Sequence, residues 1–75
     1  MTIEPEKFSK IVKEVRRQLG FSQEDLARAL GVSFATVNRW ENGKTNPSKM
    51  ARNVFKQLCK NKIESNELNL SGDEI

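Results

Sequence analysis

Hydrophobic residues recur along most of the chain at the spacing of amphipathic helices. Between residues 5 and 19 the apolar positions follow an i, i+3, i+4, i+7, i+11 pattern, formed by Phe8, Ile11, Val12, Val15 and Leu19. This spacing places one apolar stripe on a helix with 3.6 residues per turn. Pro5 suits the first turn of such a helix, and Gly20 suits the left-handed residue that ends one. The pattern predicts a first helix over residues 5–19.

Two short helices are predicted next, each preceded by a serine that can accept hydrogen bonds from free backbone amides. Ser22 precedes the second helix, and Asp25 stands where a capping-box acid reaches back to the amide of the serine. Ser33 precedes the third helix, which ends at Asn42-Gly43. Only residues 31–33 join the two helices, and a turn of this length that contains glycine is typical of a helix-turn-helix.

The apolar stripe resumes in a fourth helix and then disappears. Asn46 or Ser48 can cap this helix, with Pro47 near its start, and its stripe consists of Met50, Ala51, Val54, Phe55 and Leu58. From residue 61 onward the apolar residues fit no single helical face, and no strand alternation is found. We therefore predict an all-α fold of four to five helices in residues 1–60, followed by a polar, acidic and flexible tail over residues 61–75.

The composition narrows the functions that such a fold can serve. A chain of 75 residues forms one small domain. It has no histidine and one cysteine, Cys59, which excludes disulfides, cysteine-rich zinc sites and histidine bases. We therefore expect no catalytic residue, no metal and no cofactor, and interpret the protein as a binding module. No apolar run is long enough to cross a membrane and no apolar leader is found, which predicts a cytoplasmic protein.

The charge is distributed unevenly. Residues 1–62 hold all 13 basic residues and 6 acidic ones, a net charge of +7, whereas residues 63–75 hold 4 acidic residues and no basic one. A basic body of this kind is a candidate for binding nucleic acid. A solvated charged surface explains the charge equally well, so the charge alone does not decide between the two interpretations.

The phase of the third helix shows which side chains point outward. With Val37 directed toward the core, Trp40 also points inward, and Asn38 and Arg39 project outward. Arginine can pair with guanine through two hydrogen bonds and asparagine with adenine, whereas a merely solvated face would more often carry glutamate and lysine. We therefore favour base recognition by Arg39, and both interpretations stay open for Asn38 and Ala35.

Glu41 lies on the inward side of the same helix, where an ionised carboxylate needs a partner. Arg16 flanks the apolar stripe of the first helix. The phase of the two helices thus predicts a partly buried Arg16–Glu41 ion pair. The alternative is that both side chains reach into water.

Several strings of residues together resemble the phage-repressor, or Cro/XRE-type, helix-turn-helix family. They are QEDLA at 23–27, GVS at 31–33, TVNRWENGK at 36–44 and NPS at 46–48. The resemblance covers roughly residues 6–60. It implies a lambda-repressor-like five-helix fold, often dimeric, that acts as a sequence-specific DNA-binding regulator of transcription.

The resemblance also implies roles for individual side chains. Ser33, Phe34, Ala35 and Arg39 match base-contacting positions of the family, and helical phase adds Asn38 to them. The positions that match phosphate contacts are Gln23, Asn42, Lys44 and Thr45, and Arg16 and Glu41 match a family ion pair. Phe34 stands where a polar residue is often found, and either touches a thymine methyl group or packs at the edge of the domain.

Double-stranded DNA is the predicted partner, with residues 33–42 in the major groove and a homodimer on a palindromic operator as the form that the resemblance implies. One alternative is an antitoxin-type module in which residues 63–75 bind a second protein. Another is that the chain is the N-terminal piece of a longer protein whose function lies elsewhere.

Overall fold

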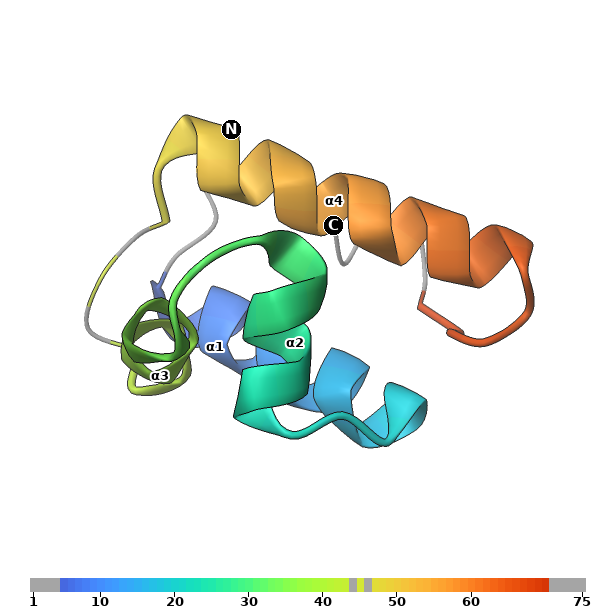
Figure 1. The fold of residues 1–75 in the computed structure, drawn as a ribbon, viewed down its shortest axis with the longest axis horizontal. Coiled ribbons are helices and arrows are strands. Elements are labelled where there is room, and N and C mark those ends of the chain that lie inside the picture. Colours follow the sequence, from blue (N-terminus) through green and yellow to red (C-terminus); the bar gives the residue numbers. More distant parts are fainter. Residues whose placement is uncertain (1–4, 44, 46, 71–75) are drawn as a thin grey trace.

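The computed structural model describes residues 5–43, 45 and 47–70, and in this part of the chain it contains four helices and no strand. They are α1 (Pro5–Leu19), α2 (Gln23–Leu30), α3 (Phe34–Glu41) and α4 (Lys49–Glu64). Figure 1 shows α4 along one side of the molecule, with α3 at one end and the C-terminal half of α4 at the other. The predicted all-α fold is confirmed. No helix in the described residues combines the length and apolar character needed to cross a membrane.

The helix boundaries follow from caps that the sequence provides. The Ser22 hydroxyl accepts a hydrogen bond from the Asp25 amide at 3.0 Å, and the Asp25 carboxylate accepts one from the Ser22 amide at 3.0 Å. The hydroxyls of Ser33 and Ser48 accept the corresponding amide bonds at the start of α3 and α4, each at 3.1 Å. Ser48 is thus the cap of α4, and Asn46 lies outside the described residues.

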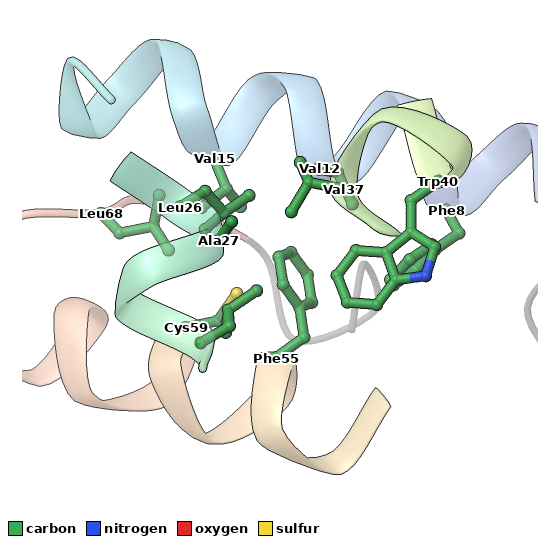
Figure 2. Packing of buried hydrophobic residues seen from close by; sticks show 11 residues of the cluster. Phe8, Val12, Val15, Leu26, Ala27, Val37, Trp40, Phe55, Cys59 and Leu68 are labelled. Atoms are coloured by element: carbon green, nitrogen blue, oxygen red, sulfur yellow. The ribbon is translucent and has the colours of Figure 1, made fainter. Parts of the chain in front are cut away.

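An aromatic cluster joins three of the helices in the core. Phe8 of α1, Trp40 of α3 and Phe55 of α4 meet edge to face, with ring centroids 5.3 to 6.4 Å apart (Figure 2). This geometry is the favoured one for aromatic pairs because it brings ring edges against ring faces. Trp40 is 3% exposed, so it belongs to the core as its phase predicts. The cluster fixes α3 against α1 and α4.

The chain beyond residue 60 differs from the expected polar tail. α4 continues to Glu64, and Asn66 then takes a left-handed conformation with φ of 64°, which turns the chain. Leu68 is buried in the core, 4% exposed. The carboxamide of Gln18 binds the backbone of Asn69 at both its amide (2.7 Å) and its carbonyl oxygen (3.1 Å). An isolated buried leucine outside a helix leaves no periodic pattern, which is why the sequence of this segment indicated a solvated tail. Residues 71–75 lie outside the described part of the chain.

Glu41 connects α3 to both preceding helices. Its carboxylate accepts two hydrogen bonds from the Arg16 guanidinium of α1, one of them at 2.8 Å, and one from the Gln23 carboxamide of α2 at 3.1 Å. Its backbone carbonyl oxygen accepts a 2.7 Å hydrogen bond from the buried Ser9 hydroxyl. Arg16 also donates to the carbonyl oxygen of Phe21, between α1 and α2. The position of α3 is therefore fixed by polar contacts as well as by apolar ones.

The surroundings of Glu41 favour its ionised form. Burial alone would raise the pKa of the Glu41 carboxyl, but the hydrogen bonds from Arg16 and Gln23, with the charges of Arg16 and Lys13, outweigh burial and lower this pKa below its ordinary value. A carboxyl group with a lowered pKa stabilises the folded state above its unfolded-chain pKa. This contribution is lost as the pH falls through the pKa of the folded state.

We expect Glu41→Gln to lower the free energy of unfolding by ~1–3 kcal/mol at pH 7, because Arg16 then loses a charged partner in a partly buried setting. The difference from the parent protein should shrink as the pH falls from about 4.3, the ordinary glutamate pKa, because the unfolded parent then takes up a proton at Glu41, and the difference is lost once the pH passes the lower pKa of the folded state. Urea denaturation between pH 7 and pH 3 measures both effects. Glu64→Gln, at an exposed position, is the control. Equal stability of the Glu41 variant and the parent at pH 7 would contradict a stabilising ion pair.

Leu68→Ala tests whether the segment after α4 is part of the domain. We expect it to lower the free energy of unfolding by ~2–4 kcal/mol. The substitution removes the hydrophobic free energy of the deleted side-chain atoms and leaves a cavity in the core. Met50→Ala is the matched control, since Met50 is 78% exposed, and should change stability by less than ~0.5 kcal/mol. Denaturant titration gives both values, and similar small effects would show that residues 65–70 do not contribute to the core.

Candidate nucleic-acid interface

The connection between α2 and α3 is a tight turn that starts at a left-handed glycine. Gly31 has φ of 73°, and its amide donates to the Arg28 carbonyl oxygen at 3.3 Å. The Val32 amide donates to the Ala27 carbonyl oxygen at 3.0 Å. Ser33 caps α3 immediately afterwards. The end of one helix and the beginning of the next thus occupy three residues, as the predicted helix-turn-helix requires.

α3 has one buried face and one exposed face. Val37, Trp40 and Glu41 are buried, at 0%, 3% and 7% exposure. All the predicted base-contacting residues are exposed, namely Ser33, Phe34, Ala35, Asn38 and Arg39. The exposed surface of α3 therefore includes Phe34, Ala35, Asn38 and Arg39, and Ser33 is the exposed N-cap of the same helix. That surface carries hydrogen-bond donors and one positive charge, and it has no carboxylate.

The structure shows what the side chains of Ser33 and Phe34 have available for a base. The Ser33 hydroxyl accepts from the Thr36 amide and shares a second hydrogen bond of 2.8 Å with the Thr36 hydroxyl. Its capping role therefore limits the hydrogen bonds that it has left for a base. The Phe34 ring is 49% exposed, so about half of its surface remains accessible to a methyl group. Within the described residues, the side chains of Asn38 and Arg39 form no hydrogen bond.

The predicted phosphate-contacting residues lie around the end of α3 and the start of α2. Gln23 is the first residue of α2, and its carboxamide donates to Glu41, the residue that precedes Asn42. Gln23 and Asn42 are therefore brought to the same part of the surface from different helices. Thr45 is exposed, and Lys44 lies outside the described residues.

Some residues of this region were not predicted from the sequence. Ser9 is buried at 6% exposure and bonds the carbonyl oxygen of Glu41, and the Gln23–Glu41 bond ties α2 to α3. The only sign in the sequence that Ser9 is buried is its position next to Phe8, a residue of the apolar stripe of α1. Both contacts depend on how the helices cross, which periodicity alone does not specify.

Cys59 and the metal-ligating side chain types were also candidates for chemistry elsewhere in the described residues. Burial raises the pKa of the Cys59 thiol to about 11, so this cysteine stays protonated and unreactive at neutral pH. No group of three side chains suited to a metal ion is found among the residues that the structure describes. The exposed face of α3, with Asn38 and Arg39, is the candidate functional site.

Comparison with known proteins agrees with this geometry. A helix-turn-helix family profile matches residues 12–50, more than half of the chain. The matched segment contains the C-terminal half of α1, all of α2 and α3, and the beginning of α4. Comparisons with curated proteins and with solved structures return no match. The chain belongs to the helix-turn-helix family of DNA-binding regulators, of the phage-repressor type that its residues resemble.

Proposed function

We propose that this protein is a cytoplasmic transcriptional repressor that binds a specific double-stranded DNA sequence with α3 in the major groove. The observation that supports it is the exposed face of α3, which presents Asn38 and Arg39 without any competing carboxylate. The groove admits one α-helix, and its floor offers a distinct hydrogen-bonding pattern for each base pair. Arg39 would pair with a guanine and Asn38 with an adenine.

In this proposal the phosphate contacts position α3 and the base contacts select the sequence. Gln23 stands at the N-terminus of α2, where backbone amides and the helix dipole favour an anion. Its carboxamide keeps one donor after the bond to Glu41, because an amide nitrogen carries two hydrogens. Asn42, Lys44 and Thr45 follow α3 in the sequence and would add further contacts to the DNA backbone.

The proposed DNA-bound form is a homodimer on a palindrome, with half-sites one helical turn apart, about 34 Å. The second role considered for residues 63–75, binding to another protein, receives no support from the described part of that segment. Leu68 is packed in the core of this chain, and Glu67 bonds to Ser65 and Lys62. A partner would have to compete with these contacts.

Selection from a random pool of duplex DNA tests the proposal. The parent protein should enrich one motif, and a two-fold symmetric motif supports the homodimer. Arg39→Ala should weaken binding to that motif by ~1–3 kcal/mol and relax the preference at one base pair, because the guanine then lacks its bidentate partner. Lys60→Ala is the control, since it removes one positive charge from the half of α4 far from α3 (Figure 1). An unchanged motif for the Arg39 variant would remove the role assigned to this side chain, and enrichment of no motif by the parent would overturn the proposed function.

Lys44→Ala should weaken binding to all DNA sequences alike. A lysine that contacts a phosphate contributes counterion release but no sequence information, so the slope of log K against log salt should fall by about one per bound subunit, and by about two for the homodimer. Binding titrations at several salt concentrations, on the selected motif and on a scrambled duplex, measure this. Loss confined to the selected motif would assign Lys44 to the bases instead.

A further inference from the structure

An open recess on the surface adjoins the end of α3. It is lined by Ser9, Lys10 and Lys13 of α1 and by Asn42 and Gly43, which follow α3. Ser9 joins its two sides, because its hydroxyl is bonded to the carbonyl oxygen of Glu41. Lys10 follows this anchored serine directly, so the two lysines are held beside the end of the helix proposed to enter the groove.

Lys10 and Lys13 differ from the arginines of the same helix in how their charge is used. The guanidinium of Arg16 is paired with Glu41, and that of Arg17 with Glu14. Lys10 and Lys13 are exposed, and neither forms an ion pair within the described residues. The two lysines lie three positions apart and therefore share one face of α1. Their charges remain available to an external anion.

Two carboxylates, those of Glu41 and Glu6, line the recess, and they differ in how much of the lysine charge they offset. Glu41 lines it, but its carboxylate is matched by Arg16 and its side chain is only 5% exposed. Lys13 and Glu41 line the same recess, and the charge of Lys13 helps to lower the pKa of the Glu41 carboxyl. Glu6 also lines the recess, is exposed, and opposes an anion there.

The dimensions of DNA determine what an element beside α3 would meet. The major groove is about 12 Å wide, and an α-helix with its side chains is about 10–12 Å in diameter. A helix in the groove thus fills it from wall to wall, and its walls are the two phosphate backbones. An exposed side chain that stands beside one end of that helix is therefore close to the rim of the groove, where the phosphates are.

We propose that Lys10 and Lys13 form a second phosphate-binding surface, which contacts the DNA backbone next to the end of α3. This inference rests on the proposed function, because it requires α3 to lie in the major groove. It extends the phosphate contacts predicted at Asn42, which lines the same recess, onto α1. The ligand is a backbone phosphate, and Glu6 moderates its binding.

Salt titrations of a double variant test the proposal on the selected DNA motif. For each bound subunit, Lys10→Gln/Lys13→Gln should lower the slope of log K against log salt by about two and the affinity at 0.1 M salt on the order of tenfold to a hundredfold, because two phosphate contacts are lost per subunit. For the proposed homodimer the slope should therefore fall by about four. The matched control is Lys56→Gln/Lys60→Gln, which removes the same charge from exposed positions of α4 and should change the slope much less. Lys10→Arg/Lys13→Arg should retain the slope of the parent, and Glu6→Gln should raise the affinity. Thermal unfolding verifies that all variants are folded.

Neutralising single phosphates locates the contact. Methylphosphonate groups are placed one at a time along the selected duplex. Neutralising the phosphate at one or two neighbouring positions should weaken DNA binding by the parent protein and leave DNA binding by the lysine double variant unchanged. The inference is overturned if the salt dependence of binding falls by the same amount in the double variant and in its α4 control. It is also overturned if each neutralised phosphate weakens DNA binding by the double variant as much as it weakens binding by the parent. If the parent selects a motif and Arg39→Ala relaxes it, either result overturns only this inference; if the parent selects no motif, the proposed function fails.

Discussion

The geometry of the site depends on the hydrogen bonds that satisfy the buried carboxylate of Glu41. An ionised group in this position is unfavourable unless it is fully bonded, and bonds come from Arg16 of α1 and Gln23 of α2. The fold therefore satisfies this one group only when α1, α2 and α3 are in their correct places. The position of the exposed face of α3 is thereby set by the fold itself, and a surface that is formed in advance loses less conformational entropy when it binds a partner.

The features that depend on neighbouring residues could be predicted from the sequence. The apolar stripe from Phe8 to Leu19, the capping box of Ser22 and Asp25, and the glycine that ends α2 are each encoded within a few positions. The phase of α3 separated its buried residues from its exposed ones for the same reason. Even the approach of Arg16 to Glu41 followed from phase, because both residues flank the stripes that pack together.

Contacts that depend on how distant segments meet could not be predicted in this way. Leu68 is an isolated apolar residue after a left-handed Asn66, and only the position of the turn brings it to the core. The bond from Gln18 to the Asn69 backbone joins residues 51 positions apart. Gln23 could be placed at the start of α2 from its cap, but its bond to Glu41 requires the crossing of α2 and α3.

The fold also gives the uneven charge of the sequence a direction in space. The acidic segment begins at the end of α4, which lies at the opposite end of the molecule from α3 (Figure 1). Glu67 is partly neutralised there by Lys62, at 3.4 Å. Arg39 and the lysines of α1 lie toward the other end, around the proposed groove-binding helix. The end with the acidic segment also carries Lys56, Lys60 and Lys62 of α4, so its acidic side chains offset basic ones and do not make that end negative. The preference of an anionic polymer for the end with α3 is therefore a difference in degree, and it weakens as salt rises.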